Sequence, residues 1–194
     1  LGRFKEEAAE KLGGIPTLIG EFGIAFDLQG KKAYRTGNFG AQVAALERGL
    51  KAMDDNLLSY TLWNYTADNT NRHGDQWNGE DLSIFSRDQQ ANPEDINSGG
   101  RALEAVVRPY ARKVAGTPLR MTFDRKHRAF EFEFEHDPAV KAPSEFFVPN
   151  YQYPDGYTVD VSDGTYEIDR SSQTVVYQHS QDWHIHDLRI KPRT

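Results

Sequence analysis

A carboxylate and an indole end two apolar stretches of the chain, and together they suit the chemistry of sugars. Glu21 ends the stretch IPTLIGEFG, and Trp63 and Asn64 end the stretch NLLSYTLWN. Because side chains at the carboxyl ends of parallel strands face the ligand in α/β folds, we expect these three residues to share one site. An indole offers an apolar face to pyranose C–H groups, and a carboxylate can attack an oxocarbenium-like carbon. Position alone leaves a second interpretation open, in which Glu21 pairs with a loop arginine.

A long polar segment, residues 67–97, holds the other candidate site residues. A loop of this length with no structure of its own is usually functional or disordered. Its sequence DQWNGED combines an aromatic ring with amides and carboxylates, the groups that bind sugar hydroxyls. We expect Trp77, Asn78 and Glu80 in the wall of a pocket, with Asp75 behind them. The alternative is a solvated loop whose carboxylates cap a turn.

The elements that must position these residues alternate between helix and strand as far as Gly116. The pattern first predicts a helix that ends at Gly13-Gly14, a strand over 15–26, and a second helix through Val43, Leu46, Leu50 and Met53. It then predicts a strand over 57–65 and a helix over 99–116 that is kinked at Pro109. This order is typical of a parallel sheet or barrel. Two strands cannot form one alone, so we expect this α/β part to pack against further chain.

The pattern changes after Gly116, where short stretches alternate with period two. In AFEFEFEH the Phe side chains would face one side and the Glu side chains the other. Turns such as PDG and SDG separate the stretches, which predicts an antiparallel β-sandwich over 117–194. His184 and His186 share one face of the last predicted strand. With no third ligand in view, we expect no metal site there.

Composition excludes several classes of protein. The formal net charge is −6 and no basic stripe occurs, which argues against nucleic-acid binding. No apolar run approaches the roughly 20 residues of a transmembrane helix, and we see no signal peptide. The chain has no cysteine, which fits a reducing compartment and slightly favours a cytoplasmic over a secreted location. No residue pattern implies a cofactor.

The motifs resemble one enzyme family when they are taken in order. IPTLIGEFGIAFD and LWNY resemble strands seven and eight of glycoside hydrolase family 5, a (β/α)8-barrel family of retaining glycosidases. GDQWNGEDLSIFS and GGRALEAVVRPYARKVAG, followed by a sandwich, are similar to its fungal branch of glucosylceramidases and steryl-β-glucosidases, related to endoglycoceramidases. The resemblance implies that residues 1–116 are the C-terminal portion of a catalytic barrel and that residues 117–194 are a terminal β-sandwich. It also implies that Glu21 is the nucleophile and that Trp63 lines the glucose subsite.

The resemblance further implies a partner for Glu21. A retaining glycosidase needs two carboxylates about 5–5.5 Å apart, and the family's acid/base lies in an Asn-Glu-Pro motif that this sequence lacks. We therefore expect the N-terminal part of the same enzyme to supply it, with the present chain a processed, nicked or separately recorded portion that is inactive alone. The implied substrate is a glycolipid, either a steryl β-glucoside or glucosylceramide. The alternatives are an endo-acting glycosidase (an endoglycoceramidase or β-glucanase) and a non-catalytic sugar-binding or scaffolding module.

Overall fold

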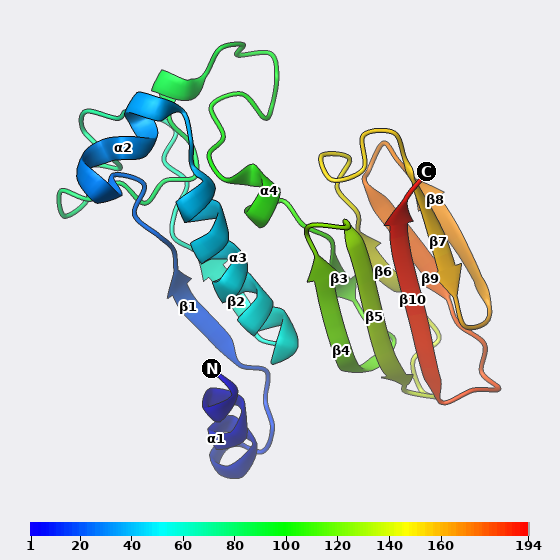
Figure 1. The fold of residues 1–194 in the computed structure, drawn as a ribbon. Coiled ribbons are helices and arrows are strands. Elements are labelled where there is room, and N and C mark those ends of the chain that lie inside the picture. The colour runs from blue at the N-terminus through cyan, green and yellow to red at the C-terminus, as the bar shows by residue number, and fades with distance from the viewer. Residues whose placement is uncertain (194) are drawn as a thin grey trace. The chain divides into compact units, whose positions relative to one another are not determined.

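A computed structural model of the chain describes residues 1–193 and divides it into two compact units (Figure 1). The first unit comprises Leu1–Met53 and Leu58–Val106, and the second comprises Asp54–Leu57 and Val107–Thr194. The units divide after Val106, whereas the sequence placed its domain boundary after Gly116. Within residues 1–193, no helix has the length and apolar character needed to cross a membrane.

The chain up to Val106 forms a parallel strand pair with helices around it. Its elements are α1 (Gly2–Leu12), β1 (Leu18–Phe22), α2 (Leu28–Thr36), α3 (Gly40–Asp55), β2 (Ser59–Leu62), the 3-10 helix η1 (Arg87–Gln89) and α4 (Leu103–Val106). β1 and β2 are parallel, with Leu18 opposite Ser59 and Phe22 opposite Leu62. This pairing confirms the predicted parallel arrangement, while α2 was not predicted.

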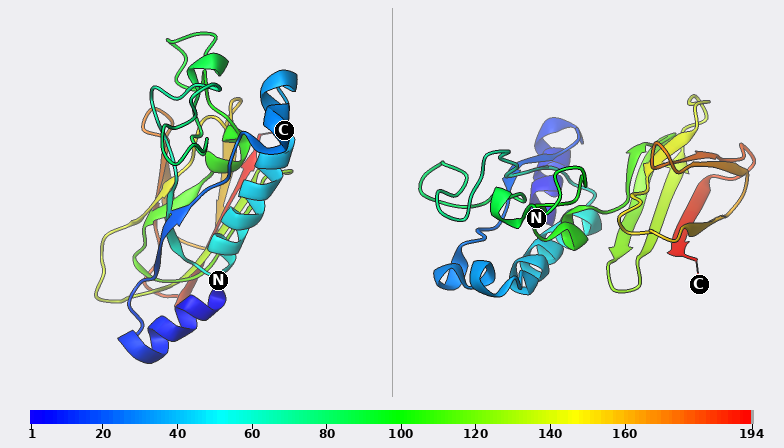
Figure 2. Two further views of the ribbon diagram at one scale, coloured as in Figure 1. Left: turned by 90° about the vertical axis from the view of Figure 1, so that its left-hand side faces the viewer. Right: turned by 90° about the horizontal axis from the view of Figure 1, so that it is seen from above.

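Helix α3 covers one face of the strand pair and closes the core of the first unit. Val43, Leu46 and Leu50 recur at helical spacing and are buried, and residues of both strands pack against them. Figure 2 shows α3 running alongside β1. The strand residues that face the helix are Phe22, Tyr60 and Leu62.

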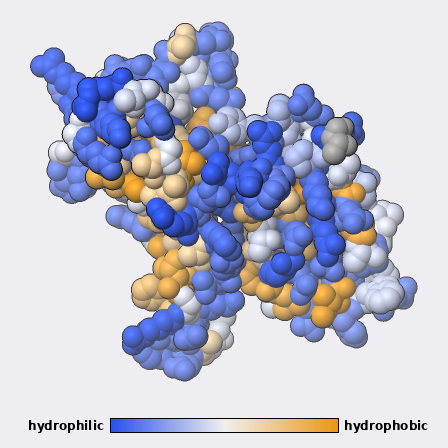
Figure 3. Space-filling model, viewed as in Figure 1, coloured by the Kyte–Doolittle hydropathy of each residue, from blue (hydrophilic) through white to orange (hydrophobic). Residues whose placement is uncertain are grey.

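The start of β1 and the helix α1 expose apolar side chains. Leu18 is 60% exposed although the sequence predicted a strand buried on both faces. The exposed residues Leu1, Phe4, Leu12 and Ile15 line a hollow beside it, and hydrophobic atoms reach the surface here in Figure 3. Exposed apolar surface of this kind marks a contact site in soluble proteins.

The helix predicted over 99–116 is wrong. Only Leu103–Val106 is helical there, and Tyr110–Lys113 forms strand β3, which pairs with strand β6 (Ser144–Phe147). Pro109 has no N–H to donate to a helix and disfavours a helical conformation in the residue before it. The backbone after the proline therefore finds its hydrogen bonds in a sheet.

The second unit is an antiparallel sandwich, as predicted. Its further strands are β4 (Gly116–Asp124), β5 (Ala129–His136), β7 (Tyr157–Val161), β8 (Thr165–Asp169), β9 (Thr174–Gln178) and β10 (Ile185–Pro192). One sheet has the order β4-β5-β10-β7 and the other β3-β6-β9-β8. Phe130, Phe132 and Phe134 of β5 are all at most 2% exposed and lie in the core, which confirms the predicted Phe face.

Candidate active site

Glu21 lies on the face of the strand pair that α3 does not cover, and Trp63 directly follows the neighbouring strand β2. Phe22 and Leu62 are paired in register, and both side chains pack into the core under α3. Because successive side chains of a strand point to opposite faces, the neighbouring Glu21 points away from the helix. Glu21 is exposed and Trp63 is partly buried. In the part of the chain that the structure describes, Glu21 has no ion-pair partner, so its predicted pairing with a loop arginine is not seen.

The two strands approach each other closely just beyond these residues. The Trp63 N–H donates to the Phe22 carbonyl at 2.8 Å, and the Trp63–Asn64 peptide bond is cis. A Cβ atom added at Gly23 would lie 1.9 Å from the Trp63 carbonyl oxygen. Only glycine fits at this position, which explains the glycine that follows Phe22.

Asn64 and Asp75 are brought together and fix the loop to the end of β2. The Asn64 side-chain amide donates to the Asp75 carboxylate at 3.0 Å, and Asp75 is only 7% exposed. The same carboxylate accepts from the Trp77 N–H at 3.0 Å and from the Leu82 N–H at 3.3 Å. Two of the predicted site residues thus bond to the protein itself, and their hydrogen bonds shape the loop.

Trp77, Asn78 and Glu80 lie on the exposed side of this loop. The Glu80 N–H donates to the Trp77 carbonyl at 3.0 Å and closes a turn between them. Trp77 is 59% exposed, and Asn78 and Glu80 are exposed as well. Gly74 permits the loop to close, because a Cβ atom there would lie 2.1 Å from the Glu80 carbonyl oxygen. All three side chains are free to contact a ligand or another part of a larger protein.

A buried ion pair that sequence reasoning missed anchors the far side of the loop. Arg101 donates to both Asp81 oxygens, at 2.6 and 3.0 Å, and the Tyr34 hydroxyl donates to the same carboxylate. The Asp81 carbonyl accepts from the Phe26 N–H at 2.7 Å, which ties the loop to the segment after β1. Burial and the hydrogen bond to Asp81 raise the pKa of Tyr34. The partners are far apart in the chain, so no local sequence pattern signals this contact.

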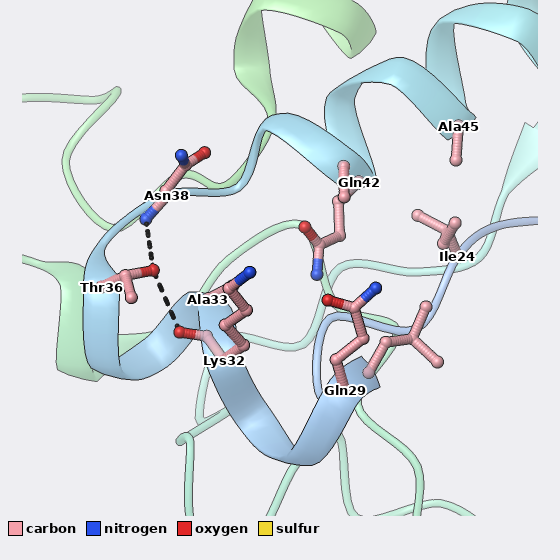
Figure 4. A pocket seen from close by; sticks show the side chains of 10 residues that line it. Ile24, Gln29, Lys32, Ala33, Thr36, Asn38, Gln42 and Ala45 are labelled. Carbon is pink, nitrogen blue, oxygen red and sulfur yellow. Dashed lines mark hydrogen bonds between the residues drawn. The ribbon is translucent and has the colours of Figure 1, made fainter.

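A separate pocket of about 330 Å³ lies between α2 and α3 (Figure 4). Thr36 donates to the Lys32 carbonyl at 3.0 Å and accepts from the Asn38 N–H at 3.3 Å along one wall. Gln29 and Gln42 contribute amides. None of the predicted site residues is among the described residues that line this pocket.

The fold matches that of known glycosidases. Residues 108–190 match the glycoside hydrolase family 5 C-terminal domain. A glucosylceramidase from Rhizopus delemar is 36% identical over 189 residues, covering 90% of this chain and 28% of the relative. The crystal structure of Cryptococcus neoformans sterylglucosidase 1 is 29% identical with a TM-score of 0.89, covering 98% of this chain and 30% of that one. Endo-glycoceramidase II from Rhodococcus sp. has the same fold with a TM-score of 0.70 at 20% identity.

A parallel strand pair with flanking helices, followed by an antiparallel sandwich, defines the C-terminal region of a (β/α)8 glycoside hydrolase. The chain is homologous to the C-terminal portion of fungal glucosylceramidases and sterylglucosidases and of endoglycoceramidases, and its residues 108–190 match the C-terminal domain of glycoside hydrolase family 5. It spans about 30% of the length of these relatives.

Proposed function

We propose that the chain contributes the nucleophile and part of the glucose subsite to a retaining β-glucosidase that acts on a lipid-linked glucose. Glu21 is the proposed nucleophile, and residues 1–116 are proposed as the C-terminal portion of the catalytic barrel. The observation that carries the proposal is the position of Glu21 at the carboxyl end of β1, on the strand face away from α3, with Trp63 directly after the paired strand β2. In a (β/α)8 barrel that face is the interior and that end is the catalytic one.

The proposed chemistry divides between two carboxylates. Glu21 attacks the anomeric carbon and forms a glycosyl-enzyme, while a second carboxylic acid protonates the leaving oxygen and then activates water. We propose that the second group belongs to the N-terminal part of the same enzyme. Trp63 supplies an apolar surface under the sugar ring, where C–H groups pack on an indole.

The loop residues are proposed in two roles. Asn64 and Asp75 hold the loop in place through their 3.0 Å hydrogen bond. Trp77, Asn78 and Glu80, which are exposed, are proposed to contact the sugar or to close its end of the pocket. A closed end would restrict the enzyme to a terminal glucose. The names of the homologues support glucosylceramide and steryl β-glucosides as the substrates to test.

The test is a Glu21→Gln variant of the full protein that contains this chain. We expect kcat to fall by roughly three orders of magnitude or more, because no group remains to form the covalent intermediate, while the melting temperature is kept. A mechanism-based fluoroglucoside should label the peptide that contains Glu21, as measured by mass spectrometry. Glu167→Gln, at an exposed position on β8, is the matched control and should keep full activity.

Three outcomes would contradict the proposal. Substantial residual activity in Glu21→Gln would remove Glu21 as the nucleophile. Labelling of another carboxylate in this chain would assign the role elsewhere. Release of an intact oligosaccharide, in place of glucose, from an oligosaccharide lipid would identify the enzyme as endo-acting.

A further inference from the structure

Three histidine side chains gather in the interior of the sandwich. His136 ends β5, His179 follows β9, and His186 lies in β10. Their exposed fractions are 6%, 3% and 0%. The ring of His186 has its centroid 4.7 Å from that of His179 and 5.1 Å from that of His136. Burial of three imidazoles side by side calls for a partner that satisfies their nitrogens.

The ring nitrogens are spaced closely enough to share one metal ion. His136 Nδ1 and His186 Nε2 are 2.9 Å apart, and one nitrogen from each of the three rings lies within 4.8 Å of the others. Nitrogens bound tetrahedrally to one Zn²⁺ at about 2.0–2.1 Å lie about 3.3 Å from each other. Small side-chain rotations would therefore bring the rings to ligand geometry.

Asp163 orients His186 as a carboxylate orients a metal-bound histidine. Its carboxylate is 2.7 Å from His186 Nδ1, so Nδ1 carries the proton and Nε2 is left with a lone pair that points toward His136. The same carboxylate accepts hydrogen bonds from the Ser180 N–H at 2.7 Å and from the Ser162 hydroxyl at 2.8 Å. These hydrogen bonds hold the carboxylate in place against the ring of His186.

His179 supplies the independent sign of a missing ligand. Within residues 1–193 its buried Nδ1 has no hydrogen-bond partner, and the hydrogen bonds that link His136, His186 and Asp163 do not reach this atom. Its Nε2 lies 3.0 Å from the Gln181 side-chain amide, which can face the ring with either its N–H or its oxygen.

We propose that His136, His179 and His186 form a binding site for a divalent transition metal ion, with Zn²⁺ as the ion that fits three imidazoles best. His136 and His186 belong to the sheet β4-β5-β10-β7, while His179 directly follows β9 of the other sheet. The ion would join the two sheets at this end of the sandwich and stabilise it. A fourth position is open to water or another small ligand.

The experiment measures Zn²⁺ binding and thermal melting in the full protein that contains this chain. After treatment with a chelator and dialysis against Zn²⁺, we expect one tightly held equivalent that is lost in His179→Ala, together with a higher melting temperature than in the chelated protein. Asp163→Asn should weaken Zn²⁺ binding about 10–100-fold, because the carboxylate positions His186 without touching the ion. Mg²⁺ should have no effect, since it prefers oxygen ligands.

His127→Ala is the matched control, because His127 is an exposed histidine on the β4–β5 turn that pairs with Asp124. It should bind Zn²⁺ like the parent. Should His179→Ala fail to fold, the unaltered protein still decides: Co²⁺ should give the intense visible absorption of a four-coordinate site. The absence of a bound equivalent in the parent would overturn the proposal, as would unchanged affinity in a folded His179→Ala.

Discussion

The backbone of Trp63 is closely packed, and its side chain is the proposed surface for sugar binding. Its carbonyl lies against Gly23, and its N–H donates to Phe22, so the backbone on both sides of the indole is fixed. A rigid aromatic surface costs little entropy when a ligand stacks on it.

We predict that Trp63→Ala lowers kcat/KM for a β-glucoside by about tenfold or more. Loss of an aromatic contact removes roughly 0.5–1.5 kcal/mol beyond the buried area, and 1.36 kcal/mol is a factor of ten in rate. Steady-state kinetics on the full protein, with its melting temperature alongside, measure the effect. Trp183→Ala is the control, since Trp183 is 64% exposed in the sandwich. Equal kinetics for Trp63→Phe and the parent would argue against stacking.

The predictability of single residues depended on how local their surroundings are. Glu21 and Trp63 could be placed at strand ends because each follows an apolar run directly. Asn64 and Asp75 were predicted to be in the pocket, and the structure bonds them to each other at 3.0 Å, which no pattern in either segment signals. The ion pair of Arg101 was missed for the same reason.

At the scale of elements, the loop over 67–97 behaves as an ordered structure because it is tied at two points. Asp75 ties it to the end of β2, and the pair of Asp81 with Arg101 ties it to the core under Phe26. The Arg101 guanidinium lies 4.3 Å from the Phe26 ring centroid, so the charge is surrounded by protein. Such a loop can hold exposed side chains in fixed positions.

Asp81→Asn should cost about 3–5 kcal/mol of unfolding free energy and loosen the loop. The change leaves the guanidinium of Arg101, which is 1% exposed, without a compensating charge. Denaturant unfolding and limited proteolysis within residues 67–97 measure the two effects. Glu7→Gln is the matched control: it breaks an ion pair with Arg3 whose side chains are 38% and 85% exposed, and should cost about 0–1 kcal/mol. Similar losses in both variants would show that the buried pair does not hold the loop.

The elements that were predicted correctly are those in which the spacing of apolar residues matches the side chains that are buried. β5 alternates Phe and Glu between core and solvent, and α3 repeats its apolar residues at helical spacing. The segment over 99–116 carries apolar residues at helical spacing too, yet its backbone pairs with β6 beyond Pro109. Helical spacing and strand pairing compete there, and a strand partner far along the chain decides between them.

At the scale of the whole molecule, the two compact units differ in how much apolar surface they leave uncovered. The sandwich buries Phe130, Phe132, Phe134 and Phe146 completely or nearly so. The first unit exposes Leu18 at 60% and Leu12 at 61%. Burial of apolar surface contributes roughly 25 cal/mol per Å² to folding. A domain that leaves apolar faces exposed to water therefore lacks much of its already marginal stability.

We therefore predict that residues 107–194 fold alone and that residues 1–106 do not. A fragment of residues 117–194, cut at the boundary that the sequence suggested, is the informative comparison. It lacks β3, one of the two strands that pair with β6, and it loses the hydrogen bond at 3.0 Å from the Ala115 N–H to the Ser144 hydroxyl. Each 1 kcal/mol lost lowers the melting temperature of a domain this size by roughly 4–8 °C. The shorter fragment should thus melt several degrees below 107–194 or fail to fold, as followed by calorimetry. Equal melting of the two fragments would show that β3 is dispensable to the sandwich, and a cooperatively melting 1–106 fragment would show that the strand pair needs no further barrel strands.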